Sequence, residues 1–520
     1  MASVTGSRLT FSNGGQTINL VLTATGATDL NGNSLAGDLV TGDTNIEVFT
    51  SMAGNIAPGY DGSAFIQGAV SVASNEVQAG TIGATEQILQ GSYALLDQFG
   101  AENIQIIGSG AGVDAVTVTG SGGDTISGST VAGNTQLIDA SNTNPGVNPG
   151  PETITGGAGN TTVWAAAGDN VTGGAGAITV AGNAMNNMTI SGASGNLETF
   201  NFGTGNSVTG ATTGTTFIDD NYGGSGNVLI GGGGGGSVTA PNGLVVPDGT
   251  YMVAGINDQV FGGSGSTLIN AIPRAGSTIT AGTGSDQIWA GTGESIIGST
   301  GLLYVAGDGG GSDTITGGGG AATVVGGATD SVTAGTGAML YSNGNTSTLT
   351  GGSGNLEAVN LGTGNDIGGA TATGATTFID DSYTNFGTGA FSGGSNTLSG
   401  GAGASTVIAG PGDTVNGGAG TLEAIFKSSL NANETVNLST AASGVRDLAE
   451  TTTGAAGTNV TVNGFSTATD QVESPDSAAT LISTSTTFGG TGGGTVLHFA
   501  DGSTMTLVGV TDPTTITFTH

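Results

Sequence analysis

Two stretches of this chain, about 160 residues apart, have nearly the same sequence. Residues 194–206 read SGNLETFNFGTGN and residues 353–365 read SGNLEAVNLGTGN. Further along, TTFIDDNY at 215–222 recurs as TTFIDDSY at 376–383. A chain of copied units usually folds as a repeat structure, because each unit buries its apolar side against its neighbours. The duplication therefore predicts a repeat architecture.

Glycine spacing shows a finer repeat inside the copies. The chain has 105 glycines in 520 residues, but short Val, Ile and Leu runs recur and only 8% of residues are charged, unlike a disordered chain. Gly-Gly pairs begin at Gly156 and Gly173, and again at Gly400 and Gly417, 17 residues apart in each case. Two strands and two glycine turns in each such period indicate an all-β fold, a parallel β-roll or β-solenoid.

The sequence divides into three regions. We expect residues 1–115 to form an N-terminal β-rich cap or assembly domain, with a hairpin over 8–25 and a helix over 84–99. Residues 116–425 form the Gly-rich solenoid, with tandem units at about 152–312 and 313–425. Residues 426–520 are expected to form a C-terminal β domain, with strands at 459–465 and 495–510 and a hairpin turn at 500–503.

The charge balance restricts the possible partners. The chain contains 38 acidic residues and only four Lys and Arg residues, which gives a formal net charge of −34. Binding to nucleic acid requires a basic patch, so we expect no nucleic-acid partner. Self-repulsion on this scale destabilises the compact state, and a divalent cation would relieve it. The alternative is an acidic surface that only keeps the protein soluble.

The route of export is also constrained. The chain has no cysteine, so neither a disulfide framework nor a thiolate metal site is possible. Its start lacks the basic and apolar regions of a Sec signal peptide, and no run of 18 apolar residues is present to span a membrane. We therefore expect a protein that does not span a membrane and that, if exported, uses another route.

The motif G-x-G-x-D-x-U, in which U is apolar, places an aspartate after a glycine turn. Such turns aim carbonyl oxygens inward and let the carboxylate reach an ion between adjacent coils, and hard oxygen ligands suit Ca²⁺. The candidate calcium ligands in full or nearly full motifs are Asp124, Asp286, Asp313 and Asp366, with the turn glycines Gly282, Gly284, Gly362 and Gly364. Shorter versions of the motif contain Asp169, Asp330 and Asp413.

These motifs resemble the repeats-in-toxin (RTX) family, whose Gly- and Asp-rich nonapeptides fold into a calcium-loaded parallel β-roll. Residues 465–473 (FSTATDQVE) and 495–511 (TVLHFADGSTMTLVGVT) also look like the C-terminal region of type I secreted proteins. The resemblance covers about residues 116–520. It implies bound Ca²⁺ and an uncleaved C-terminal signal that the type I secretion machinery reads.

The same aspartates have a second interpretation that needs no metal. Many repeats keep the glycines and lack the aspartate, as in GGAGNTTV at 156–163, and an ion between coils needs ligands from two successive turns on one side. An aspartate can instead accept hydrogen bonds from turn amides. Both interpretations stay open for Asp286, Asp313 and Asp366, whereas the sequence favours the turn interpretation for Asp169 and its two short-motif counterparts.

The sequence offers little support for a catalytic function. The duplicated pairs Asp219-Asp220 and Asp380-Asp381 are adjacent in predicted strands, so their carboxylates should point to opposite faces rather than form a dyad. The chain contains two histidines, His498 and His520, and no HExxH, GxSxG or P-loop motif. We therefore expect a protein that is not an enzyme.

The leading hypothesis is a secreted, self-associating structural protein of the bacterial cell surface or extracellular matrix, similar to surface-layer proteins. Its partners would be other copies of itself, the secretion machinery and cell-surface polysaccharide, with calcium stabilising some turns. An alternative is an extracellular adhesin or ligand-binding module that presents regular Thr rows to a glycan or to ice. A third hypothesis, an RTX exoenzyme, would need a catalytic constellation in residues 1–115, and none is apparent there.

Overall fold

The computed structural model is all-β. It describes the strands between residues 7 and 119, then residues 123–140, 151–427, 433–438, 457–473, 493–499 and 502–519, with short gaps between 183 and 393, and further strands between 443 and 487. In the described part of the chain, no helix is long and apolar enough to cross a bilayer. The chain divides into two compact units, Met1–Ile269 and Asn270–His520, called unit 1 and unit 2 below.

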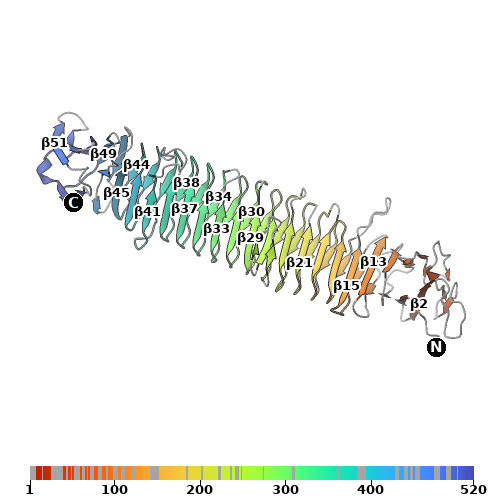
Figure 1. Ribbon diagram of the computed structural model, residues 1–520. Helices are drawn as coiled ribbons and strands as arrows, with labels where there is room; N and C mark the ends of the chain where they lie inside the picture. The colour runs from red at the N-terminus through yellow and green to blue at the C-terminus, as the bar shows by residue number, and fades with distance from the viewer. Residues whose placement is uncertain are drawn as a thin grey trace. The chain divides into compact units, whose positions relative to one another are not determined.

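Each unit contains stacked coils of a parallel β-solenoid. One turn of the coil contributes a short strand to one sheet, called the short-strand sheet, and a longer strand to a second sheet, called the long-strand sheet. Figure 1 shows this stacking in unit 2, where β33, β37 and β41 follow one another along the long-strand sheet. The predicted all-β solenoid is confirmed.

In unit 1 the short-strand sheet contains β10 (Thr85–Ile88), β12 (Asn103–Ile106), β14 (Thr125–Ser127), β16 (Thr153–Thr155), β18 (Asn170–Thr172), β20 (Thr189–Ser191), β22 (Ser207–Thr209), β24 (Val228–Ile230) and β28 (Gln259–Phe261). Its long-strand sheet contains β9 (Asn75–Ala79), β11 (Ser92–Asp97), β13 (Gly112–Thr119), β15 (Asn134–Asp139), β17 (Asn160–Trp164), β19 (Ile178–Ala181), β21 (Leu197–Phe200), β23 (Thr216–Asp219) and β27 (Gly249–Val253). Strand β29 (Ser266–Asn270) lies where the two units meet in sequence.

In unit 2 the short-strand sheet contains β30 (Thr278–Thr280), β32 (Ser295–Ile297), β34 (Thr314–Thr316), β36 (Ser331–Thr333), β38 (Thr348–Thr350), β40 (Asp366–Gly368), β42 (Thr397–Ser399), β44 (Thr414–Asn416), β46 (Asn433–Asn437), β49 (Asn459–Asn463) and β53 (Thr504–Val508). Its long-strand sheet contains β31 (Asp286–Trp289), β33 (Leu303–Ala306), β35 (Ala322–Val325), β37 (Met339–Asn343), β39 (Leu356–Asn360), β41 (Thr377–Asp380), β43 (Ser405–Ala409), β45 (Thr421–Lys427), β47 (Ser443–Val445) and β48 (Ala449–Glu450).

The remaining strands lie outside these two stacks or at their ends. They are β1 (Ser7–Asn13), β2 (Gln16–Ala24), β3 (Leu39–Thr41), β4 (Asn45–Glu47), β5 (Thr50–Ser51), β6 (Gly59–Tyr60), β7 (Phe65–Ile66), β8 (Gly68–Val70), β25 (Val238–Thr239), β26 (Val245–Val246), β50 (Gln471–Glu473), β51 (Leu481–Thr487), β52 (Gly494–Phe499) and β54 (Thr517–Thr519), with a 3₁₀ turn at Pro513–Thr515.

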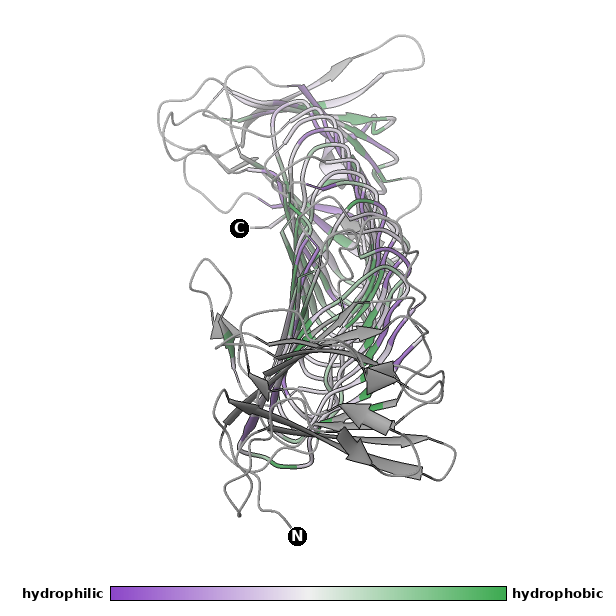
Figure 2. Ribbon diagram, turned by 90° about the vertical axis from the view of Figure 1, so that its right-hand side faces the viewer, coloured by the Kyte–Doolittle hydropathy of each residue, from purple (hydrophilic) through white to green (hydrophobic). Residues whose placement is uncertain are grey.

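The core is made of aliphatic columns that run from coil to coil. Many short strands, such as β30, β34 and β36, have the pattern Thr/Ser–aliphatic–Thr/Ser, and in these only the central residue is buried. In-register pairing places Ile315 directly between Ile296 of the preceding coil and Val332 of the next. All three are buried. In Figure 2 hydrophobic residues occur in the strands of both sheets, as expected for a core enclosed between them.

Glycine lets the turns of successive coils stack closely. A Cβ at Gly301 would overlap the carbonyl oxygen of Gly284 in the preceding coil, whereas a Cβ at Gly374 would meet nothing within 4 Å. We expect Gly301→Ala to destabilise the protein by about 1–3 kcal/mol, because the two backbones must separate. Gly374→Ala should be neutral or slightly stabilising. Urea unfolding of the two variants checks this, and equal effects would contradict the stacking of these turns.

Several local predictions can now be compared with the structure. The expected hairpin over 8–25 is confirmed by antiparallel β1 and β2, and the expected hairpin turn near 500–503 by antiparallel β52 and β53. The expected helix over 84–99 is wrong, because β10 and β11 occupy that segment and pair in parallel with neighbouring strands. This pairing satisfies the backbone with tertiary partners and overrides a weak local preference for helix. Parallel pairing also extends beyond 116–425 on both sides.

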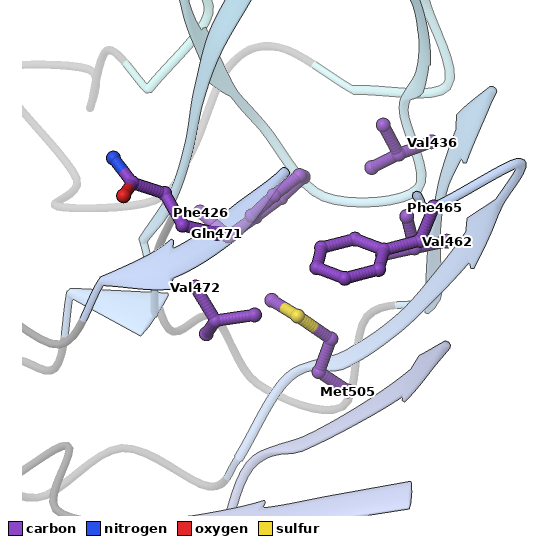
Figure 3. A pocket seen from close by; sticks show the side chains of 7 residues that line it. All are labelled: Phe426, Val436, Val462, Phe465, Gln471, Val472 and Met505. Atoms are coloured by element: carbon purple, nitrogen blue, oxygen red, sulfur yellow. The ribbon is translucent and has the colours of Figure 1, made fainter. Parts of the chain in front are cut away.

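Apolar side chains cover the core near the C-terminal end of unit 2. They surround an enclosed space of only about 10 Å³, shown in Figure 3. Its lining residues are Phe426, Val436, Val462, Phe465, Gln471, Val472 and Met505. A space this small and this apolar is a packing gap rather than a ligand site.

Candidate functional site

A column of buried polar residues runs through each unit, in most coils directly before the short strand. We call it the polar ladder. Its members in unit 1 are Asp124, Glu152, Asp169, Asn206, Asn227 and Asp258, and in unit 2 they are Ser277, Glu294, Asp313, Asp330, Ser347, Asn365, Asn396, Asp413 and Glu434. In unit 1 the apolar Met188 takes the ladder position between Asp169 and Asn206.

The ladder side chains hydrogen-bond the backbone of the preceding coil. Oδ1 of Asp330 accepts the N–H of Asp313 at 2.9 Å, and Oδ1 of Asp313 accepts the N–H of Glu294 at 2.7 Å. In unit 1 the N–H of Glu152 donates to Oδ1 of Asp169 at 2.8 Å. The amide before each short strand has no partner in its own sheet, so the ladder satisfies a backbone group that would otherwise be buried unpaired.

Four ladder aspartates use their second oxygen in the same way. Oδ2 of Asp169 accepts the N–H of Ala166 at 2.8 Å, three residues earlier in the turn. Oδ2 of Asp330 accepts the N–H of Gly327 at 2.6 Å. Asp258 and Asp413 repeat the arrangement with Gly255 and Gly410. A carboxylate is needed there because it alone accepts at both oxygens.

The predicted site residues fall into three groups. Asp124, Asp169, Asp313, Asp330 and Asp413 all lie in the ladder and are buried. The carboxyl oxygens of Asp169, Asp313, Asp330 and Asp413 accept backbone amides, as the turn interpretation expects.

The other two predicted aspartates lie elsewhere. Asp286 is buried at the start of β31, in the turn on the opposite side of the coil from the ladder, and Asp366 is exposed at the start of β40. The glycines predicted with them, Gly282 with Gly284 and Gly362 with Gly364, lie in these same two turns. Gly364 has a positive φ of 73°, which favours glycine. The glycines at 309 and 310, before Asp313, lie outside the described residues.

The structure thus brings some of the predicted aspartates together without forming a metal cluster. Asp313 and Asp330 occupy successive coils on one side, as an ion between coils would require. Within the described ranges, no group of three or more His, Cys, Asp or Glu side chains is arranged to hold a metal ion. Calcium at these positions remains a prediction.

Burial raises the pKa of the ladder carboxyls. Desolvation raises the pKa of Asp169 to about 6 and that of Asp313 to about 6. It also raises the pKa of Asp330 and Asp413, against the opposing effect of their hydrogen bonds. The pKa of Glu434 rises to about 9, first through burial and then through the nearby charge of Asp413.

Sequence reasoning missed the amide and glutamate members of the ladder. Glu152, Glu294, Asn227 and Asn396 lie outside the G-x-G-x-D-x-U motif, so a motif search passes over them. A usable signal was present, because each directly precedes a three-residue short strand. A polar residue before most such triplets predicts the ladder better than the glycine spacing does.

The duplicated aspartate pairs point to opposite faces, as expected. Asp220 and Asp381 are fully buried, whereas Asp219 and Asp380 lie on the outer side of the same strands. Nδ2 of Asn227 donates to Oδ2 of Asp220 at 2.6 Å, and Nδ2 of Asn396 donates to Oδ2 of Asp381 at 2.7 Å. The tyrosines that end the two copies, at 222 and 383, lie outside the described residues, as does the histidine at 520.

The outer surface of the short-strand sheet carries rows of small polar side chains, called the threonine rows. In-register pairing aligns the first residue of each strand. In unit 2 this row contains Thr278, Ser295, Thr314, Ser331, Thr348, Thr397, Thr414, Thr435 and Thr461, interrupted by Asp366. Rows of this kind have a spacing of about 4.7–4.9 Å between coils.

The outer surface of the long-strand sheet is different. In unit 2 it exposes Tyr304, Val325, Leu340 and Phe378, with Leu302 in the turn before β33, and we call this set the apolar face. Part of it borders a surface hollow of about 440 Å³ that Leu340, Glu357 and Phe378 help to line. Along one column of this face, Tyr304, Leu340 and Phe378 alternate with Thr323 and Glu357. Several exposed apolar side chains on one sheet face are typical of an interaction surface.

Comparisons with known proteins found no match to this chain. No protein-family model matches it, no curated protein matches it, and no solved structure matches it.

Proposed function

We propose that this chain is a secreted, non-enzymatic structural protein that associates with copies of itself at a bacterial cell surface or in an extracellular matrix. Export through a type I secretion system is part of the proposal and rests on the resemblance of its C-terminal region. The observation that carries self-association is the apolar face of unit 2. A repetitive sheet with exposed aromatic and aliphatic side chains is suited to packing against an identical sheet.

The proposal includes calcium bound at the surface of the long-strand sheet. Glu357 is exposed between Leu340 and Phe378 in the same column of the long-strand sheet, and Glu423 projects from the same sheet. Two such faces would repel each other through these carboxylates, in a chain whose net charge is already −34. A divalent cation bound between carboxylates of two copies would convert this repulsion into a bridge.

Light scattering of the full chain in millimolar calcium and in EDTA tests the proposal. We expect particles much larger than the monomer in calcium, and their reversal by EDTA. Leu340→Asp should weaken association at least tenfold, because it puts a charge at the centre of the apolar face. The matched control is Thr348→Asp, which makes the same change in charge on the other sheet and should still associate. A chain that stays monomeric in calcium would contradict the proposal.

The threonine rows favour a second candidate function, a binding module for an ordered hydroxyl surface such as ice or a crystalline glycan. Regularly spaced hydroxyl groups, interrupted by a charge at Asp366, suit a partner that is itself regular and uncharged. In this case the protein remains a monomer in calcium and is taken up into growing ice or onto an insoluble glycan. Thr348→Asp would then abolish binding and Leu340→Asp would not, the reverse of the pattern expected for self-association.

A further inference from the structure

Each copy of the FIDD sequence places a second buried carboxyl group beside a ladder aspartate. In unit 1 this pair is Asp220 and Asp258, and in unit 2 it is Asp381 and Asp413. We call them the acid pairs. Asp220 and Asp381 are 0% exposed, and Asp258 and Asp413 are 1% exposed. The groups in each pair belong to successive coils of one unit.

Glycine backbone lets the two carboxyl groups approach. A Cβ at Gly255 would lie 2.7 Å from Oδ2 of Asp220 and 3.1 Å from Oδ2 of Asp258, so both oxygens lie against the same Cα. In unit 2 a Cβ at Gly410 would lie 2.7 Å from Oδ2 of Asp381, and the N–H of Gly410 donates to Oδ2 of Asp413 at 2.7 Å. The side chain of Asp220 is within hydrogen-bonding distance of Asp258, and that of Asp381 is within hydrogen-bonding distance of Asp413.

One asparagine connects the members of each pair. Asn227 donates its side-chain amide to Asp220, and its backbone N–H donates to Oδ1 of Asp258 at 2.9 Å. Asn396 does the same between Asp381 and Asp413, with its backbone N–H at 2.9 Å from Oδ1 of Asp413. Asn227 follows its aspartate by 7 residues and Asn396 by 15, so two different chain lengths produce the same arrangement.

The two segments that form the pairs supply no basic residue of their own. Residues 203–261 and 362–426 contain no Lys, Arg or His. The titratable groups near the first pair include Asp219, on the outer side of the same strand, and those near the second include Asp380, on the outer side of its strand, and Glu434, next in the ladder. All are acidic, so two ionised carboxylates in either pair would be buried against like charge.

Two buried carboxyl groups also have oxygens that receive no hydrogen bond from the described protein atoms. Oδ1 of Asp220 is buried and receives no hydrogen bond from the described protein atoms. The same is true of both carboxyl oxygens of Glu434, which is 1% exposed. Deprotonated, these oxygens would be buried acceptors without donors, which is costly. Protonation removes the charge, and a neutral carboxyl group costs much less to bury than a carboxylate.

We propose that the acid pair of unit 1, Asp220 and Asp258, binds one proton in the folded protein, shared between its two carboxyl groups as an O–H···O hydrogen bond, and that folding of the solenoid is therefore coupled to proton uptake. The protein is then more stable in mild acid than in alkali. This is a property of that pair and is independent of whether the chain associates with itself.

The direction of the effect follows from the pKa. Burial, followed by the contact with Asp258, raises the pKa of Asp220 from 3.8 to about 9. Between those values the folded state holds a proton that the unfolded state has lost. Stability is therefore fully present below the unfolded pKa and declines as pH rises toward the folded one, with the folding constant falling tenfold per pH unit for each proton.

The test is to measure the free energy of unfolding of the full chain by urea unfolding between pH 5 and pH 9. In this range the proposal requires stability to fall as pH rises. The wild-type protein should lose stability as pH rises. In the variant Asp220→Asn, a neutral side chain replaces the protonated one, and the slope should fall by about one proton, a tenfold smaller change in the folding constant per pH unit. The control, Asp219→Asn, alters the adjacent outer carboxylate and should keep the wild-type slope.

An unchanged slope in the Asp220→Asn variant would overturn the proposal, as would a wild-type stability that does not fall with pH. If that variant does not fold, infrared spectroscopy of the wild-type protein decides the question. The folded protein at neutral pH should show the carbonyl stretch of a protonated carboxylic acid, and unfolding at the same pH should remove it. Absence of this band in the folded protein would contradict the proposal.

Discussion

Replacing Ile296 with alanine is expected to destabilise unit 2 by about 2–5 kcal/mol, the usual cost of removing a large aliphatic side chain from a packed core. Ile296 is 0% exposed and stacks directly on Ile315 of the next coil. Its neighbour in sequence provides the control. Ile297 is the same residue type on the same strand but is 42% exposed, because it points outward.

Ile297→Ala should change the free energy of unfolding by less than about 0.5 kcal/mol, as for most surface substitutions. Urea unfolding of the full chain, followed by circular dichroism, compares the two variants under the same conditions. The difference tests the alternation that builds the aliphatic column. Equal losses from Ile296→Ala and Ile297→Ala would contradict the assignment of inner and outer faces in this sheet.

Removing the carboxylate of Asp330 is expected to have an effect of similar size. Asp330→Ala leaves the N–H of Asp313 and the N–H of Gly327 without their acceptor, since the two oxygens of Asp330 serve one each. A buried amide without a partner costs about 1–3 kcal/mol, so we expect a loss of about 2–5 kcal/mol in all. Asp330→Asn keeps one acceptor oxygen and should fall between alanine and the wild type.

Asp366→Ala is the control for this prediction, because Asp366 belongs to the same predicted motif but is exposed. It should leave stability within about 0.5 kcal/mol of the wild type. Both variants should be measured by urea unfolding in EDTA and in calcium. The polar ladder requires the full loss from Asp330→Ala in EDTA. A loss that appears only in calcium would show that Asp330 acts as a metal ligand and would contradict its role as an amide acceptor.

The sequence predicts the architecture well for a clear physical reason. Triplets such as Thr314–Thr316 alternate outer and inner side chains with period two, and glycine turns separate them at a nearly constant interval. Both signals are local and repeat many times along the chain. The helix expected over 84–99 was wrong because its apolar spacing is ambiguous, and pairing with neighbouring coils decided the outcome.

The polar ladder could be predicted only in part. Aspartates after glycine turns, such as Asp169 and Asp313, attract attention as possible ligands, and sequence alone does not distinguish a metal from a backbone amide as the partner. The acid pairs were even harder to predict from the sequence. Asp381 and Asn396 meet across 15 residues whereas Asp220 and Asn227 meet across 7, so the contact depends on loop paths that the sequence does not specify.

The absence of cysteine from the sequence makes the most direct test of the coil stacking possible, because introduced cysteines carry spin labels at chosen positions only. Thr314 and Thr348 are 34 residues apart in sequence but two coils apart in the threonine row, roughly 10 Å by the spacing of paired strands. Thr314 and Thr323 are only 9 residues apart but lie on opposite sheets with their side chains pointing away from each other.

Electron paramagnetic resonance of the doubly labelled proteins should show strong dipolar broadening for the pair at 314 and 348. The pair at 314 and 323 should show much weaker broadening, because dipolar coupling falls steeply with distance. This order, in which the residues farther apart in sequence are closer in space, is what parallel in-register coils require. Stronger broadening for 314 with 323 than for 314 with 348 would contradict the solenoid.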